Sequence, residues 1–111
     1  MYYLTYYIPD SDNERVKQAL FESGAGKIGN YDQCCWEVLG NGQFRALKGS
    51  QPSLGEINQL EQIAEYKVEM VCADENIDTV LERLLKEHPY EQPAYFISQV
   101  MTLADLKLTK K

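Results

Sequence analysis

The sequence predicts a single α+β domain, an antiparallel sheet that carries two helices on one of its faces. Two amphipathic helical patterns occur in the chain, and each lies between segments that alternate apolar and polar residues. Each helical pattern ends in a cluster of glycine or proline, at residues 24–31 and 88–93. The chain therefore consists of two β-α units, and its unusual residues gather at the two helix exits.

Length and charge limit the classes of function. The chain has 111 residues, enough for one domain, and a formal net charge of −6, which argues against nucleic acid or an anionic membrane as partner. No apolar run approaches the roughly 20 residues of a membrane span. Because the first residues lack the basic segment of a signal peptide, we expect a cytoplasmic protein. The three cysteines have no CxxC spacing, so free, buried or half-buried thiols are expected, with a metal or redox role as the alternative.

The first β-α unit is predicted from a strand pattern, a capping box and a glycine that ends the helix. Residues 2–8 are aromatic and β-branched and stop at Pro9, which indicates a strand. Ser11 and Glu14 have the spacing of a capping box, so a helix is expected over residues 11–23. Gly24 is a suitable left-handed stop for that helix.

The middle of the chain predicts a hairpin. Residues 33–39 form a strand pattern, and the glycines of 40–42 predict a turn into a second strand at 43–47. Phe44, Arg45 and the irregular loop at 49–55 suggest an interface arm. Residues 55–65 leave two alternatives open, a helix or a short strand with a loop.

The second β-α unit repeats the first. Residues 66–72 alternate as a strand, Asp74 is a candidate cap for a helix over 75–87, and the proline after His88 ends that helix. A last strand is expected from residue 95 to 100. We assign residues 1–101 to the domain and residues 102–111 to a short tail that forms a final turn or an arm.

Together these elements predict a ferredoxin-like βαββαβ fold. Two helices cover only one face of such a sheet, and the strands are apolar on both faces, with 8 tyrosines in the chain. The second face is therefore expected to pack against another subunit.

Three segments make the sequence specific: residues 24–34, residues 42–52 with Gly55, and residues 88–95. With them the chain, from about Tyr3 to Val100, resembles the CutA-like (PII-like) domain inserted in YqfO-type members of the Nif-three-like family. It also resembles small stand-alone proteins made of that domain. The resemblance implies a ferredoxin-like fold and a trimer formed through sheet edges and the exposed sheet face. It implies no activity, because the family's dinuclear metal site belongs to flanking domains, and the link of CutA proteins to divalent-metal tolerance rests on fold.

His88, the only histidine, is the first candidate for chemistry. With Glu91, and with Cys34 or copies from other subunits, it could ligate a divalent metal, the one cofactor that these residues suggest. One histidine and one carboxylate are fewer than the three protein ligands of a typical catalytic zinc site. The alternative is a helix C-cap, with the imidazole hydrogen-bonded to the last carbonyls of the helix.

The glycine-rich loop is the second candidate. Its amides and Lys27 could hold an anion, although phosphate loops normally precede a helix and this one follows a helix. The alternative is a helix stop. We expect this loop and the segment after the second helix to meet, at a cleft between subunits, and to form a ligand site from Lys27, Asn30, Tyr31, His88, Tyr90 and Glu91.

The sequence therefore favours a non-enzymatic, trimeric CutA/PII-like protein that binds a small ligand or divalent metal in a regulatory or structural role. No catalytic residue is assigned, and the ligand is not identified. The alternative is a small metal-dependent, hydrolase-like enzyme that uses His88 and Glu91.

Overall fold

The computed structural model describes residues 1–109 and has the predicted class of fold. Its strands are β1 (Tyr2–Pro9), β2 (Trp36–Arg45), β3 (Leu60–Cys72) and β4 (Tyr95–Gln99). Its helices are α1 (Asn13–Glu22), α2 (Ile77–Glu87) and α3 (Leu103–Thr109). Two short 3-10 turns, η1 (Asp10–Asp12) and η2 (Asp74–Asn76), precede α1 and α2.

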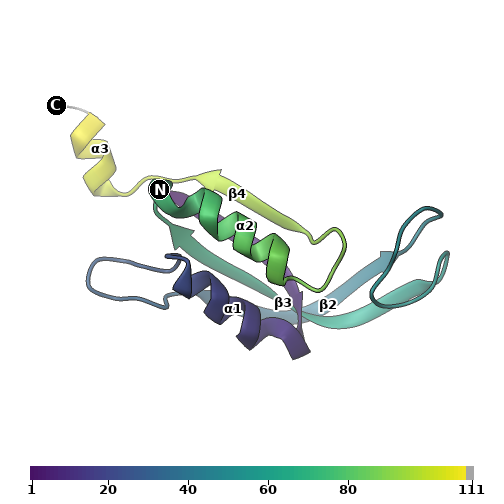
Figure 1. Ribbon diagram of the computed structural model, residues 1–111. Coiled ribbons are helices and arrows are strands. Elements are labelled where there is room, and N and C mark those ends of the chain that lie inside the picture. Colours follow the sequence, from purple (N-terminus) through teal and green to yellow (C-terminus); the bar gives the residue numbers. More distant parts are fainter. Residues whose placement is uncertain (110–111) are drawn as a thin grey trace.

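The four strands form one antiparallel sheet in the order β2-β3-β1-β4. Helices α1 and α2 lie side by side over the same face of this sheet (Figure 1). The α+β ferredoxin-like prediction is confirmed.

The core lies between that face and the two helices. Leu4, Tyr6 and Ile8 alternate inward along β1 and are fully buried. They pair with Met70, Val68 and Tyr66 of β3, and the helices close the core with Val16, Leu20, Val80 and Leu84. Each fully buried aliphatic side chain of this kind contributes about 1.5–3 kcal/mol. The helical and strand periodicities of the sequence therefore correspond to the buried faces.

Both main helices begin without the predicted side-chain caps. The hydroxyl of Ser11 contacts the Asp12 carboxylate at 3.3 Å, and α1 starts only at Asn13. Asp74 lies in η2 and pairs with the amino terminus at 2.6 Å. A 3-10 turn precedes each helix instead. The Asn13 amide donates to the Asp10 carbonyl of η1, and the Asn76 amide of η2 donates to the carbonyl of Ala73.

The predicted turn at residues 40–42 is wrong. Strand β2 runs straight through Gly40 and Gly42 and pairs with β3 along its whole length, so residues 33–39 and 43–47 do not form a hairpin with each other. The hairpin is the longer one between β2 and β3. The ambiguous segment at 55–65 accordingly resolves as a loop followed by strand, because β3 begins at Leu60.

The β2–β3 hairpin makes the molecule long. Beyond the register position of Pro9 and Glu65, β3 has lost its β1 partner and only β2 accompanies it. The principal extents are 55 × 24 × 23 Å and the radius of gyration is 16.0 Å, against about 13 Å for a compact domain of this length. Figure 1 shows the hairpin projecting away from the two-helix body.

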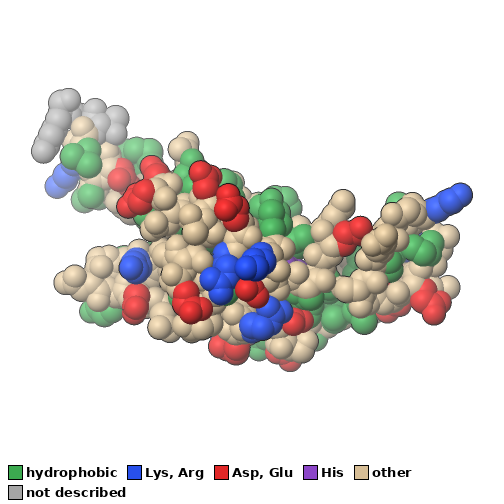
Figure 2. All heavy atoms as spheres, viewed as in Figure 1, with side chains coloured by type: hydrophobic (Ala, Val, Ile, Leu, Met, Phe, Trp, Pro, Cys, Tyr) green, Lys and Arg blue, Asp and Glu red, His purple; other side chains and the backbone are tan. Residues whose placement is uncertain are grey.

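The two faces of the body differ in polarity. Over the helices, basic and acidic side chains are interspersed (Figure 2), and Arg15 and Arg83 form ion pairs that join α1 to α2. On the opposite face of the sheet, Trp36 is 66% exposed and Phe96 is 63% exposed. Large aromatic side chains of the uncovered face therefore remain open to solvent in the single chain.

The tail forms a helix and not merely a turn. Helix α3 stands away from the body (Figure 1), and Leu103, Leu106 and Leu108 are exposed on it. None of the helices within residues 1–109 is both long and apolar enough to cross a membrane.

Candidate functional site

The segment after α2 is held on the end of β1 by His88. The imidazole is buried, with its Nε2 atom 2.7 Å from the carbonyl oxygen of Tyr7. Its Nδ1 atom accepts the amide of Tyr90 at 3.1 Å. These two bonds fix the neutral tautomer with the proton on Nε2. The Tyr7 amide in turn donates to the carbonyl oxygen of Ala94, so the Tyr7 peptide is clamped on both sides.

Burial is the main cause that lowers the pKa of His88. The bond to the Tyr7 carbonyl and the nearby Asp12 act in the opposite direction, while Arg15 lowers it further. In the single chain His88 is therefore a buried, neutral residue at the end of α2. Its imidazole binds a carbonyl of β1 and not the last carbonyls of α2 that the C-cap alternative requires.

The rings of His88, Tyr90 and Phe44 contact one another in sequence, from the buried imidazole to the cavity wall. The Tyr90 ring lies 5.1 Å from the imidazole and 5.9 Å from the ring of Phe44, both measured between centroids. Phe44 belongs to β2, so this contact joins the segment after α2 to the long hairpin. The Tyr90 and Phe44 rings also form part of a cavity wall.

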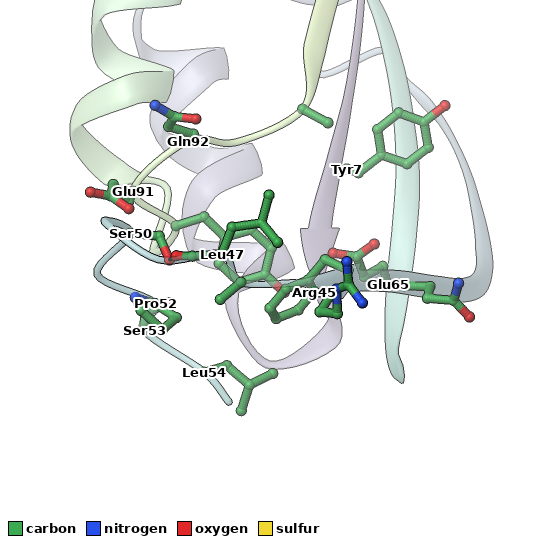
Figure 3. Close-up of a pocket in the computed structure, with 15 residues that line it drawn as sticks. Tyr7, Arg45, Leu47, Ser50, Pro52, Ser53, Leu54, Glu65, Glu91 and Gln92 are labelled. Atoms are coloured by element: carbon green, nitrogen blue, oxygen red, sulfur yellow. Dashed lines mark hydrogen bonds between the residues drawn. The ribbon is translucent and has the colours of Figure 1, made fainter. Parts of the chain in front are cut away.

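The cavity has a volume of about 600 Å³ and lies between that segment and the hairpin. Figure 3 shows Glu91 and Gln92 on one side, Ser50, Pro52, Ser53 and Leu54 on the loop after β2, and Arg45 and Glu65 on the strands. Phe44, Leu47, Pro52, Leu54 and Ala94 give it an apolar lining. An apolar hollow of this size with a few polar groups is typical of small-molecule sites.

Two polar groups inside the cavity interact with each other. The Tyr90 hydroxyl is buried and makes no hydrogen bond of good geometry, yet it lies close enough to the Glu65 carboxyl to affect it. Burial raises the pKa of Tyr90 to about 12, and the Glu65 charge adds to the effect. Burial also raises the pKa of Glu65, and its contact with Tyr90 partly offsets that rise.

Gly42 provides the space for the Glu65 side chain. A β-carbon at residue 42 would collide with the Glu65 carboxyl group, whereas one at Gly40 would meet nothing within 4 Å. The glycine that the sequence suggested for a turn therefore serves a close approach between neighbouring strands.

Glu91 closes the cavity wall. Its Oε1 atom accepts the backbone amide of Gln51 at 3.0 Å, which ties the segment after α2 to the loop after β2. The same loop is held to the end of β2 by the Asn58 amide, which donates to the Ala46 carbonyl at 2.6 Å. In the single chain Glu91 thus holds the loop after β2 against the segment after α2.

The glycine-rich loop lies at the opposite end of the body. The Gly26 amide donates to the carbonyl of Val71, which pairs with Tyr3, whereas His88 binds Tyr7, about 13 Å further along β1. Figure 1 shows the loop after α1 and the segment after α2 at opposite ends of the two helices. Within one chain, Lys27, Asn30 and Tyr31 therefore do not meet His88, Tyr90 and Glu91. All three residues of that loop are exposed.

The suggested metal ligands are not assembled in one chain either. Both imidazole nitrogens of His88 are engaged by the backbone, and half-buried Cys34 lies by the other loop, where its amide donates to the Gly26 carbonyl. Across residues 1–109 no three His, Cys, Asp or Glu side chains come close enough together to hold a metal ion. Within residues 1–109 of a single chain, His88, Glu91 and Cys34 therefore do not form a metal centre.

Sequence reasoning missed Glu65 and the cavity around it. Tyr90 and Glu91 were identified, but Glu65 lies in an ordinary alternating strand and carries no motif. The one available signal was the pair of glycines in β2, and it was assigned to a turn.

The chain is similar in sequence and structure to a segment of several longer bacterial proteins. It is 43% identical over 91 residues to the GTP cyclohydrolase 1 type 2 homolog of Mycobacterium tuberculosis, an alignment that covers 82% of this chain and 24% of that protein. The homolog of the same name from Bacillus subtilis is 38% identical over 97 residues, covering 87% and 26%. In structure, the Bacillus cereus protein related to NIF3 superposes with a TM-score of 0.77 at 29% identity, over 91% of this chain and 26% of that one.

This chain resembles a segment of the Nif-three-like proteins. It spans about a quarter of the length of the curated relatives it matches. No family model matches the chain. The resemblance drawn from residues 24–34, 42–55 and 88–95 is thereby confirmed.

The fold as a whole is that of CutA proteins. The PII-like protein CutA from Nostoc sp. PCC 7120 superposes with a TM-score of 0.67 at 19% identity, over 98% of this chain and 89% of that one. CutA1 from Pyrococcus horikoshii gives a TM-score of 0.66 at 17% identity. At such identities the likeness concerns the fold alone.

Proposed function

We propose that this chain is a non-enzymatic, CutA/PII-like protein that assembles as a homotrimer and binds a small ligand in the cavity beside Tyr90. Its role is regulatory or structural. The observation that carries the proposal is the cavity itself, about 600 Å³ in volume, in which an apolar lining surrounds the buried Tyr90 hydroxyl and the Glu65 carboxyl. A regulatory protein needs such a site, and it needs no catalytic group inside it.

Assembly is supported by what the single chain leaves exposed. The uncovered sheet face carries Trp36, Val38 and Phe96, each more than half exposed, and the projecting hairpin carries exposed Leu39 and Leu60. A two-stranded ribbon is marginally stable by itself in water, so packing between copies would stabilise it. The CutA-like fold favours three copies.

Assembly would also give the glycine-rich loop a place in the site. In a single chain that loop lies at the far end of the body, so Lys27, Asn30 and Tyr31 would reach Tyr90 and Glu91 only from a neighbouring copy. We retain this shared site as part of the proposal.

We place the protein in the cytoplasm and treat residues 1–101 as the folded domain. Free thiols at Cys34, Cys35 and Cys72 support a reducing compartment. The alternative of a metal-dependent enzyme using His88 and Glu91 receives no support from the geometry, because the imidazole nitrogens and the Glu91 carboxylate are bound to the backbone.

The cavity is tested by thermal shift with nucleotides, divalent metals, small anions and small amines. A compound at one hundred times its Kd stabilises the native state by about 2.7 kcal/mol. Leu54→Trp should fill the cavity and abolish the rise in Tm. Leu103→Trp, a change at an exposed leucine of α3, should leave it intact. A compound that stabilises wild type and Leu54→Trp equally would place the ligand outside this cavity.

A further inference from the structure

The Glu65 carboxyl is a half-buried acid without a basic partner. Within residues 1–109 no Lys or Arg nitrogen lies within 4.0 Å of it, although eight ion pairs of that length occur elsewhere in the molecule. The group that does influence it is the Tyr90 hydroxyl. A carboxylate removed from water without a cation is costly, and a cation entering the cavity would offset that cost.

The Tyr90 hydroxyl, which lies against the Glu65 carboxyl, is the second polar group of this site. Its oxygen is buried and its proton faces the Glu65 carboxyl, so its remaining hydrogen-bonding capacity is that of an acceptor. Glu65, when ionised, only accepts. The two groups together therefore match a ligand that brings several N–H donors and a positive charge.

The cavity walls favour a ligand that has an apolar aromatic or aliphatic part next to its positive charge. Phe44 and Tyr90 present aromatic rings, whose faces attract cations, and Leu47, Pro52 and Leu54 complete the lining. Arg45 also borders the cavity, but its side chain is exposed, where water and salt screen its charge. Glu91 adds a second carboxylate to the rim, so an anionic ligand would meet two like charges.

We propose that the cavity selects small organic cations, an amine or guanidinium on an aromatic or aliphatic frame, with the charged group held at the Glu65 carboxyl. This inference rests on the proposed function, because it names the ligand class of the same cavity. It commits the site to recognition by charge and shape, with no bond made or broken.

The test measures binding of three matched probes to the full chain at neutral pH, by calorimetry and by amide chemical-shift changes. Phenethylamine carries the cation, phenethyl alcohol is its neutral counterpart, and phenylacetate is the anion. The amine is expected to bind at least about tenfold more tightly than either. Its shift changes should centre on Leu47, Leu54 and Tyr90.

Two pairs of variants locate the charge. Glu65→Gln should weaken amine binding about tenfold and leave the alcohol unchanged, whereas Glu61→Gln, on the same strand, should change neither. Gly42→Ala, which displaces the Glu65 carboxyl, should weaken the amine, and Gly40→Ala should not. Circular dichroism and Tm confirm that each variant is folded.

The outcomes separate the two proposals. If the alcohol or phenylacetate binds at these residues as tightly as the amine, or if Glu65→Gln binds the amine normally, the cation inference is wrong while the cavity remains a ligand site. If neither these probes nor the wider ligand panel shifts the cavity residues, the proposed function fails together with it.

Discussion

At the scale of single residues, His88 shows how one side chain can join distant parts of the chain. Its ring forms hydrogen bonds with two backbone groups, the carbonyl of Tyr7 and the amide of Tyr90. These residues are 83 positions apart in sequence but adjacent in the fold. The bond from the Tyr90 amide requires the neutral ring, because Nδ1 must accept. Protonation would break that bond and keep the one to the Tyr7 carbonyl.

This predicts an acid-sensitive fold. The folded pKa of His88 lies below the ordinary value of 6.5, so below pH about 6.5 the unfolded chain takes up a proton that the folded chain does not. Stability is therefore complete above that pH and declines as the pH falls toward the folded pKa. The measurement is the urea midpoint between pH 7.5 and 5.5, together with the NMR titration of the single histidine.

The matched variant is His88→Gln, whose amide nitrogen can still reach the Tyr7 carbonyl. It should lose the decline in this pH window, whereas His88→Ala should cost about 1–3 kcal/mol at pH 7.5 by leaving that carbonyl without a donor. A native imidazole that titrates at or above 6.5 would contradict the prediction.

A second residue-scale prediction concerns Lys17, which lies between two carboxylates. Its Nζ atom is 2.9 Å from Glu14 and 2.8 Å from Glu37, but the Glu14 side chain is 84% exposed and that of Glu37 only 27%. The bond from Lys17 is the main cause that lowers the pKa of Glu37, and the Asn13 amide assists.

Glu37→Gln should therefore destabilise the fold by about 1 kcal/mol or more, while Glu14→Gln should stay within about 0.5 kcal/mol. Chemical denaturation at pH 7 measures both. Because the pKa of Glu37 is depressed in the fold, its contribution is present at neutral pH and is lost as the pH falls through the folded pKa. If both variants lose the same free energy of unfolding, the difference in burial between the Lys17–Glu37 and Lys17–Glu14 ion pairs does not affect their strength, and the prediction is wrong.

At the scale of elements, we expect the tail and the body to be separable. Helix α3 has seven residues, too few for a stable isolated helix, and its leucines are exposed. The hydrogen bond from Val100 to the Met1 carbonyl closes the sheet before the tail begins.

Removing residues 102–111 should therefore leave the circular dichroism spectrum of the body intact and change the free energy of unfolding by less than about 0.5 kcal/mol at low protein concentration. A matched variant changes Leu103, Leu106 and Leu108 to Gln and keeps the rest of the tail. Comparing its free energy of unfolding with that of the truncated chain distinguishes an effect of the leucine side chains from an effect of the whole helix. A body that unfolds without the tail would contradict the division at residue 101.

At the scale of the whole molecule, the exposed sheet face predicts assembly. Light scattering at micromolar concentration should give about three times 12.7 kDa. Trp36→Glu, on the uncovered face, should shift the mass toward one chain, because a buried unpaired carboxylate opposes the contact. Leu85→Glu, at a 47% exposed leucine of α2, is the control and should remain assembled.

The single tryptophan gives an independent readout. Trp36 is 66% exposed in the isolated chain, so its emission should move to shorter wavelength as the protein concentration rises and copies cover it. A wild-type protein that keeps the mass of one chain at high concentration would overturn the trimer.

The sequence by itself determined the parts that depend on neighbouring residues. The alternation in β1 and β3 and the helical stripes of α1 and α2 defined the buried face, since each pattern has the period of its own element. The proline cluster of residues 88–93 also marks a distinctive helix exit, and Tyr90 and Glu91 of that segment line the cavity.

Only the tertiary structure decided the course of β2 and the position of the cavity. The turn preference of Gly40 and Gly42 is local and weak, and ten paired residues with β3 override it. The two helix exits lie at opposite ends of the body, because the loop after α1 binds Val71 beside Tyr3 whereas the segment after α2 binds Tyr7 further along β1. Glu65 meets Tyr90 because the segment after α2 reaches the long hairpin, a contact between residues that no local pattern connects.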